Sequence, residues 1–232
     1  MNVDAIIFDF DGVLLESEYE LNRLTAELLT ELGHPHTFEE AIEHYTGLAG
    51  RHVIEVIEAR IGRPLPQEFH DRMSAEGKRA LVEGIEPIAG AIDFVRSLPS
   101  ALPRAIASSS STRWIRTHLA HLGLEDLFEP HLYSGREHVE RGKPAPDLYL
   151  YAADQLEVDI ARTVIIEDSK VGATGALASG ARVIGLAAGS HCLDGHADKL
   201  RAVGVSDIAH NFDEVARLIG LDQPSRGSPA SR

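Results

Sequence analysis

Two hydrophobic patterns alternate over most of this chain and indicate its secondary structure. Short apolar runs, typical of strands buried in a parallel sheet, occupy residues 5–8, 104–107, 131–133, 163–166 and 182–186. Segments whose apolar side chains recur at helical spacing lie between the later runs, at residues 89–98, 114–122, 145–156 and 171–179. Strands that alternate with helices in this way predict an α/β fold with a doubly wound parallel sheet.

One long stretch interrupts this alternation directly after the first apolar run. Residues 16–85 contain no strand pattern and favour four short helices, the third of which ends at Gly62. The run Thr37-Phe38-Glu39-Glu40 predicts a capping box. We therefore expect a helical insertion at residues 16–85, a core of residues 1–15 and 86–221, and a disordered tail, rich in Pro, Ser and Gly, at residues 222–232.

Polar side chains follow the predicted strands at the point where each strand ends. The first strand leads into Asp9-Phe10-Asp11-Gly12, the second into four serines at 108–111, and the strand at 163–166 into Glu167-Asp168-Ser169. A fourth segment, Gly142-Lys143-Pro144, stands just before a predicted helix. Because ligands of open α/β sheets bind at the carboxyl ends of the strands, we expect all four segments to share one crevice.

The residue types in this crevice indicate phosphoryl transfer. Adjacent carboxylates such as Asp9 and Asp11 repel each other unless a cation or a shared proton compensates. Several carboxylates together suit Mg²⁺, whereas a serine hydroxyl and a lysine suit phosphate. A carboxylate can also be the nucleophile and carry the phosphoryl group as an aspartyl phosphate. Each segment alone has a plainer interpretation, because Asp-Gly turns, serine loops, surface lysines and acidic residues before helices are common.

Together the four segments resemble the motifs of the haloacid dehalogenase superfamily of phosphotransferases. Asp9-Phe10-Asp11-Gly12-Val13-Leu14 resembles the first motif, Ser108 the second, Lys143 the third and Glu167-Asp168 the fourth, in matching order and spacing. The helical insertion resembles the cap domain of the subgroup that contains β-phosphoglucomutase and many sugar-phosphate phosphatases. The resemblance extends to about residue 220 and implies a Rossmann-like catalytic core with a four-helix cap.

The resemblance implies a role for each matched residue. Asp9 would attack the phosphorus, and Asp11 would protonate the leaving oxygen and then activate a water molecule. Mg²⁺ would be held by the Asp9 carboxylate, the Asp11 backbone carbonyl and Asp168. Glu167 would lie near the metal and contact it directly or through water. Lys143 would pair with the phosphate and with the Asp9 carboxylate.

Further residues are candidates for binding the substrate. Ser108 would donate to a phosphate oxygen, and one of Ser109 and Ser110 would reach the phosphate as well. In the cap, Arg51 of the loop at 46–52 could bind a carboxylate or a second phosphate, or could equally be a solvated helix residue. The remaining cap candidates are Ser17, Glu20, Leu21, Lys78 and Arg79.

Two functions stay open after the motifs are placed. The expected one is a Mg²⁺-dependent phosphatase that hydrolyses a small phosphorylated sugar or sugar acid; the alternative is a phosphosugar mutase of the β-phosphoglucomutase type. In the mutase pattern a histidine of the first cap helix assists the acid/base, and Leu21 at the matching position favours hydrolysis. A non-catalytic binding protein is disfavoured because every motif residue is present. Glu16 stands where many relatives carry aspartate, a difference at the hinge into the cap.

Composition limits the partners of this chain. Its 232 residues carry a formal net charge of −14, and such a surface repels nucleic acid and anionic membranes. Cys192 is the only cysteine, so no internal disulfide can form, and the N-terminus has no signal-peptide pattern. We expect a cytoplasmic monomer whose partner is a small phosphorylated metabolite. Most of the 12 histidines are expected at the surface, with His34 and His36 in a turn and no chemistry at His191 or His196.

Overall fold

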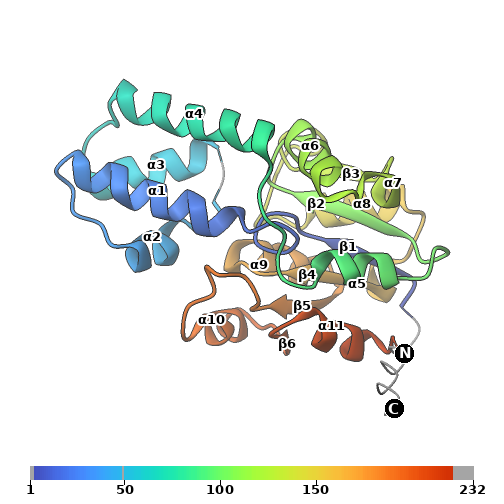
Figure 1. The fold of residues 1–232 in the computed structure, drawn as a ribbon. Helices are drawn as coiled ribbons and strands as arrows, with labels where there is room; N and C mark the ends of the chain where they lie inside the picture. The colour runs from blue at the N-terminus through green and yellow to red at the C-terminus, as the bar shows by residue number, and fades with distance from the viewer. Residues whose placement is uncertain (1–2, 49, 222–232) are drawn as a thin grey trace, which may run out of the picture.

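The computed structural model describes residues 3–48 and 50–221, so the expected disordered tail at 222–232 lies outside the described residues. Within them the chain forms a six-stranded sheet covered by helices on both faces, with four further helices standing to one side (Figure 1). No helix in this described part combines the length and the apolar character needed to cross a membrane.

Every strand of the sheet runs parallel to its neighbours. In the order β3-β2-β1-β4-β5-β6, β1 lies near the middle, and the chain builds outward from it on both sides. The carboxyl ends of β1 and β4 therefore form the switch point at which open α/β sheets bind ligands, and the predicted doubly wound parallel sheet is confirmed. The strands are β1 (Ala5–Phe8), β2 (Arg104–Ser108), β3 (Leu132–Ser134), β4 (Thr163–Glu167), β5 (Arg182–Leu186) and β6 (Asp207–Ala209).

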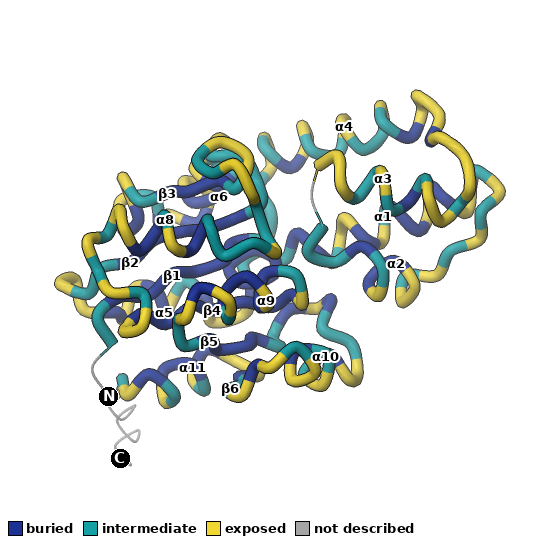
Figure 2. The backbone as a smooth tube through the Cα atoms, turned by 180° about the vertical axis from the view of Figure 1, so that it is seen from behind, coloured by how far each residue is buried: buried dark blue, intermediate teal, exposed yellow. Residues whose placement is uncertain are grey.

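Alternate side chains of the strands enter two separate hydrophobic cores. Ile6 and Phe8 enter the core that is covered by α5 (Ala91–Ser97), α6 (Thr112–Leu122), α7 (Glu125–Phe128) and α11 (Phe212–Ile219). Ile7 enters the core that is covered by α8 (Asp147–Gln155), α9 (Lys170–Ala178) and α10 (His196–Ala202). All three side chains are fully buried, and the central strands β1, β2 and β4 are dark blue in Figure 2. Burial on both faces explains why these strands read as continuous apolar runs.

The predicted helical insertion is present and has a small core of its own. It consists of α1 (Ser17–Glu31), α2 (Phe38–Tyr45), α3 (Arg51–Ile61) and α4 (Gln67–Glu83). Thr37 forms the predicted capping box with Glu40, and Gly62 ends α3 in the left-handed conformation. The side chains buried between these helices include Leu28, Leu29, Ile57, Leu65 and Phe69.

Two linkers join the insertion to the sheet and lie side by side. The Glu16 backbone N–H donates to the Glu86 carbonyl at 2.9 Å, and Leu15 pairs with Pro87 in an isolated bridge. The chain therefore enters and leaves the insertion at one place. The expected division into a core of residues 1–15 and 86–221 and a cap of residues 16–85 follows these linkers and stays a prediction.

Five short elements in the described C-terminal half were not predicted: α7, a 3-10 helix (Ile160–Arg162), α10, β6 and α11. β6 has only three residues, too few for an alternating pattern to be recognised. In α11 the signal was available, because its buried residues recur at helical spacing: Phe212, Val215, Ala216 and Ile219. The turn expected at His34 and His36 lies in the connection between α1 and α2.

Candidate active site

The carboxyl ends of β1, β2 and β4 lie next to each other at the centre of the sheet. Phe8 of β1 pairs in register with Ile106 of β2 and with Ile166 of β4. The residues that follow these positions, among them Asp9 and Glu167, therefore reach the same edge of the sheet. The topology thus gathers the polar segments that the sequence places after separate strands.

Lys143 is the cation at the centre of this edge. Its Nζ lies 2.5 Å from Asp9 Oδ1 and 2.7 Å from Glu167 Oε1, so the expected contact with Asp9 is present. All three side chains are buried, with exposed fractions of 3% for Lys143, 9% for Asp9 and 0% for Glu167. Burial alone would lower the pKa of Lys143, but the two carboxylates raise it above its ordinary value. Lys143 therefore stays charged and balances part of the negative charge of the site.

Glu167 is held by hydrogen bonds on both carboxylate oxygens. Oε1 accepts from Lys143 and, at 2.7 Å, from the Tyr149 hydroxyl. Oε2 accepts from the backbone N–H and the hydroxyl of Ser169, at 3.0 and 3.1 Å. Four donors match the four lone pairs that a carboxylate offers. This arrangement disfavours the direct metal contact that was one of the two expected options, and it holds the Glu167 carboxylate against Lys143.

Asp11 accepts hydrogen bonds from four side chains. Oδ1 accepts from the Ser17 hydroxyl at 2.7 Å and from Trp114 Nε1 at 3.0 Å. Oδ2 accepts from Ser110 at 2.6 Å and from Ser108 at 3.3 Å. Ser17 belongs to α1 of the insertion and Trp114 to α6 of the core, so Asp11 touches both parts. No local pattern marks Trp114 as a site residue, because the approach of its indole N–H to Asp11 depends on how α6 packs.

The serine run at 108–111 has two tasks at once. Ser111 caps α6 by accepting from the Trp114 backbone N–H at 3.2 Å. Ser108 accepts from the Ser110 backbone N–H at 3.0 Å, and Ser109 lines the same cavity as its neighbours. The run is therefore both the helix cap of the plainer interpretation and a row of hydroxyl groups beside Asp11.

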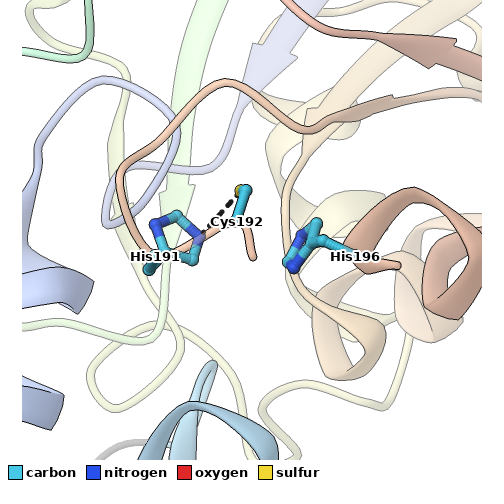
Figure 3. Close-up of side chains that lie close together, drawn as sticks. All are labelled: His191, Cys192 and His196. Carbon is cyan, nitrogen blue, oxygen red and sulfur yellow. Dashed lines mark hydrogen bonds between the residues drawn. The ribbon is translucent and has the colours of Figure 1, made fainter. Parts of the chain in front are cut away.

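Asp168 is buried and contacts two histidines that follow β5. His191 Nε2 lies 2.8 Å from Asp168 Oδ2, and His196 Nε2 lies 2.7 Å from the Asp168 backbone oxygen. Burial lowers the pKa of His196 to about 4, so its ring is neutral. Figure 3 shows both rings with Cys192 between them. The expectation of surface positions is wrong for these two histidines, which are 0% and 9% exposed.

The carboxylates at this edge fit a hard divalent cation. Asp9, Glu167 and Asp168 are all buried, and each offers an oxygen within 4.8 Å of the others. Asp168 Oδ1 is a buried oxygen without a hydrogen-bond partner among the described residues. Burial, and then the charge of Glu167, raise the pKa of Asp168 well above its usual value, a shift that a bound cation would offset. Oxygen donors with one oxygen unsatisfied suit Mg²⁺.

A cavity of about 540 Å³ lies over this edge, between the sheet and the insertion. The motif carboxylates and Lys143 line its inner wall. The predicted cap residues Ser17, Glu20 and Leu21 line it from α1, and Lys78 and Arg79 are not among its lining residues. Of the predicted loop at 46–52, Ala49 lies outside the described residues, and the lining part is Gly47, Leu48 and Gly50.

The cavity contains a different arginine from the one expected. Arg51 is 91% exposed and pairs with Glu55 at 2.7 Å, which corresponds to its alternative reading as a solvated helix residue. Arg136, in the loop after β3, lines the cavity instead. It lies against the cap loop, since a Cβ at Gly50 would be 3.0 Å from its guanidinium. No motif marked Arg136, because its place beside the cap loop depends on how the insertion packs on the core.

Glu18 is a second residue of the cavity that was not predicted from the sequence. It is buried at the start of α1, and its carboxylate accepts from Asn22 Nδ2 at 3.0 Å and from the Gly47 backbone N–H at 3.2 Å. Burial, and then the charge of Asp168, raise the pKa of Glu18 to about 8. Its neighbour Glu20 was named from the sequence, but the sequence does not show which of these two glutamates is buried.

Comparison with known proteins identifies a family whose match includes the residues that meet at this site. Residues 6–186 match the family of haloacid dehalogenase-like hydrolases, a range that includes all four motif segments. A relative named phosphorylated carbohydrates phosphatase, from Thermotoga maritima, is 31% identical over 185 residues, which cover 77% of this chain and 82% of the relative.

Two solved structures extend the likeness over nearly the whole chain. A haloacid dehalogenase-like protein of unknown function from Agrobacterium tumefaciens is 34% identical, with a TM-score of 0.83 and coverage of 94% of this chain and 97% of that chain. A family hydrolase from Deinococcus radiodurans, solved with bound phosphate and sodium, is 32% identical, with a TM-score of 0.77 and coverage of 97% and 99%. The family match spans most of the sequence and its motif residues meet at one edge of the sheet, so this chain belongs to the haloacid dehalogenase-like hydrolases.

Proposed function

We propose that this enzyme is a Mg²⁺-dependent phosphatase that hydrolyses a small phosphorylated sugar or sugar acid through an aspartyl phosphate. One observation carries the proposal: the buried cluster of Asp9, Lys143 and Glu167 lies beside the unsatisfied oxygen of Asp168, in the wall of a cavity under the cap. Burying several charged side chains lowers the stability of the fold. A cluster of this kind therefore indicates a site that binds a cation and an anionic substrate.

The donor set specifies which residues would hold the metal. The carboxylates of Asp9 and Asp168 and the backbone carbonyl of Asp11 would bind Mg²⁺, with Glu167 set behind Lys143. When bound, the metal supplies positive charge that offsets the phosphate and helps to orient it.

In the first half of the reaction Asp9 is the nucleophile. One of its carboxylate oxygens attacks the phosphorus, and the bond between phosphorus and the sugar oxygen breaks. Asp11 donates a proton to that oxygen, so the sugar leaves as a neutral alcohol. The ammonium group of Lys143, 2.5 Å from Asp9, stabilises the negative charge on the phosphoryl oxygens electrostatically. The hydroxyl group of Ser108, which donates to Asp11 at 3.3 Å, would turn to donate to the phosphate when the substrate is bound.

In the second half the aspartyl phosphate is hydrolysed. A water molecule attacks the phosphorus while Asp11 takes one of its protons, and the bond between phosphorus and the Asp9 oxygen breaks. Inorganic phosphate leaves, Asp9 is again a carboxylate and Asp11 is again protonated. Atoms and charges therefore balance over one turnover.

The lining and the volume of the cavity suit a small polar substrate. Glu20, Ser74 and Glu76 line it from the cap, and Arg136 lines it from the core. Carboxylates and a hydroxyl suit the hydroxyl groups of a sugar, and a guanidinium suits an anionic group. The volume of about 540 Å³ falls within the range of roughly 300–1,000 Å³ usual for small-molecule sites. The name of the Thermotoga maritima relative supports the same substrate class.

Leu21 bears on the mutase alternative. Its side chain lines the cavity and is 39% exposed, at the place where the mutase pattern has a histidine that assists the acid/base. A leucine cannot transfer a proton. Hydrolysis therefore stays the favoured activity.

The test is phosphate release from a panel of sugar phosphates, phosphoglycolate and β-glucose 1-phosphate, with Mg²⁺ and with a chelator. We expect release with Mg²⁺ only, and a fall on the order of 10³-fold or more in Asp9→Asn. The matched control is Asp93→Asn, a change of an exposed aspartate on α5 that should leave the rate unaltered. Release that survives in Asp9→Asn would contradict the proposal, and conversion of β-glucose 1-phosphate to the 6-phosphate without release would identify a mutase.

A further inference from the structure

The loop between β5 and α10 reaches back to Asp168, and no step of the reaction above uses it. His191 of this loop is fully buried and places Nε2 2.8 Å from Asp168 Oδ2. Because a carboxylate only accepts, the His191 Nε2–H is the donor. The other oxygen, Oδ1, is buried without a partner among the described residues. The hydrogen bond thus occupies one oxygen of Asp168 and leaves the other for a ligand.

Two glycines make room for this pair. A Cβ at Gly189 would lie 2.6 Å from atoms of the His191 ring. A Cβ at Gly12 would lie 2.2 Å from Asp168 Oδ2 and 3.1 Å from His191 Cε1. A larger residue at either place would therefore displace the ring or the carboxylate. Gly12 of the first motif is therefore required for two reasons. It leaves space for the contact between His191 and Asp168, and it adopts a φ of 83°, which favours glycine.

Contacts on both sides hold the loop in place. The Glu16 carboxylate accepts from the backbone N–H and the hydroxyl of Ser190, at 3.0 and 3.1 Å. On the other side, His196 Nε2 lies 2.7 Å from the Asp168 backbone oxygen. The loop is thereby tied to the cap linker and to the backbone of Asp168. Glu16, the departure noted at the hinge, takes part in this attachment.

We propose that His191 is a positioning residue that orients the Asp168 carboxylate for Mg²⁺, an inference that rests on the proposed function. The donor at Oδ2 fixes the rotation of the carboxylate and keeps Oδ1 available to the cation. Hydrogen-bond partners of metal ligands set ligand orientation, and their loss typically weakens metal binding by about 10–100-fold. His191 acts through Asp168 and does not touch the reacting atoms.

The same loop also has the spacing of a soft-metal site. His191, Cys192 and His196 offer ligand atoms within 4.8 Å of one another (Figure 3). The Nε2 atoms of both histidines nevertheless already form hydrogen bonds with Asp168. A metal bound to these two atoms would break the hydrogen bonds that hold Asp168 in place. The geometry therefore favours the positioning role. Cys192 Sγ lies 3.4 Å from the same His191 Nε2, a weak contact beside the bond to Asp168.

The experiment measures Mg²⁺ binding to chelator-treated full-length protein by calorimetry and by the rise of Tm with Mg²⁺ concentration. His191→Phe keeps a buried ring without the donor, and we expect its Kd for Mg²⁺ to rise by about 10–100-fold. His191→Gln restores an N–H at similar reach and should return the Kd to within roughly fivefold of wild type. His210→Phe, the same change at an exposed histidine that follows β6, should change the Kd by less than about twofold.

Separate outcomes distinguish the inference from the function on which it rests. An unchanged Kd in His191→Phe, in a protein whose wild type binds Mg²⁺ and releases phosphate, would overturn the inference alone. Equal weakening in His210→Phe and His191→Phe would also overturn it. A wild type that binds no Mg²⁺ would remove the proposed function and the inference together. Should His191→Phe fail to fold, Gly189→Ala carries the same test, because its Cβ would lie 2.6 Å from the His191 ring and displace it.

Discussion

Lys143 is the residue on which the electrostatics of the active site depend most directly. We predict that Lys143→Met, which removes the charge and keeps the apolar stem, lowers the free energy of unfolding by about 3–5 kcal/mol. The reason is that Asp9 and Glu167, 2.5 and 2.7 Å from Nζ, would be left as buried carboxylates without a counter-ion. Denaturant unfolding at neutral pH without added metal measures the change.

A surface lysine provides the control for this prediction. Lys170 is 48% exposed and its Nζ lies 3.7 Å from Glu43, a type of ion pair that contributes less than about 1 kcal/mol. Lys170→Met should therefore change the free energy of unfolding by less than that amount. Equal stability of the two variants would contradict the account of Lys143 as a buried counter-ion.

Glu18 predicts a pH dependence of stability in the metal-free protein. Its pKa rises from an ordinary value of 4.5 to about 8 on folding, chiefly through burial. The folded chain keeps this proton where the unfolded chain has lost it. The associated stability is complete below about pH 4.5, falls by at most about 1.4 kcal/mol per pH unit above that, and is gone once the pH passes about 8.

Glu18→Gln removes this dependence because the amide stays neutral at every pH. The variant should gain stability relative to wild type between pH 5 and pH 8.5, measured by denaturant unfolding in the presence of a chelator. Glu39→Gln, a change of an exposed glutamate on α2, should show no such trend. A difference between Glu18→Gln and wild type that stays constant over this range would refute the buried proton.

At the scale of one element, α9 depends on a glycine in its first turn. A Cβ at Gly172 would lie 1.6 Å from Glu167 Oε1. Gly172→Ala must therefore push Glu167 away from Lys143 and Tyr149. We predict a loss of about 1–3 kcal/mol in the free energy of unfolding, together with reduced phosphate release. Thermal unfolding and the phosphate assay measure the two effects.

Gly77 in α4 is the counterpart that should respond in the opposite direction. Nothing lies within 4 Å of a Cβ built there. Because alanine restricts the unfolded chain and favours a helix, Gly77→Ala should stabilise the protein by about 0.4–1 kcal/mol. If both variants lose stability to the same extent, helix context and not the contact with Glu167 explains the effect.

The sequence predicted elements that have a long helical pattern, a capping signal or an apolar run buried on both faces of the sheet. The apolar run at residues 5–8 became β1, and the capping box at Thr37 starts α2. β6 escaped prediction because Asp207-Ile208-Ala209 pairs along only one side, as an edge strand. An edge strand of three residues is defined by its neighbour β5 more than by its own sequence.

On the scale of the whole molecule, the substrate cavity exists only because the cap covers the sheet. Arg136 of the core lies against Gly50 of the cap at this junction. We predict that Arg136→Met raises KM about tenfold, or about 1.4 kcal/mol, for substrates with a second anionic group. Substrates without such a group should change by less than about twofold. Steady-state kinetics on matched sugar and sugar-acid phosphates measure the difference.

Arg51→Met is the comparison variant, since Arg51 is 91% exposed and pairs with Glu55. Its KM values should stay within about twofold of wild type for both substrate groups. A larger effect in Arg51→Met than in Arg136→Met would mean that the sequence-based assignment of Arg51 was the correct one. The expectations of a monomer in the cytoplasm also belong to this scale and stay predictions.

The sequence by itself determined the class of fold, the place of the insertion and the motif residues that meet at the site. Each of these follows from local chemistry: buried strands need unbroken apolar runs, helices need apolar residues at helical spacing, and motif residues stand at strand ends. The parallel pairing of β1 and β4 then brings Asp9 and Glu167 together, and the segment before α8 adds Lys143 to them.

Only the tertiary structure decided which remaining polar groups reach the site. His191, Trp114 and Arg136 come from a loop, a helix and a second loop far from the first motif, and none has a local pattern that marks it. Arg51 has the charge expected of a substrate ligand but lies on the outer side of its helix, paired with Glu55. The physical reason is that direction and burial depend on how elements pack, a property of the whole chain that no short segment encodes.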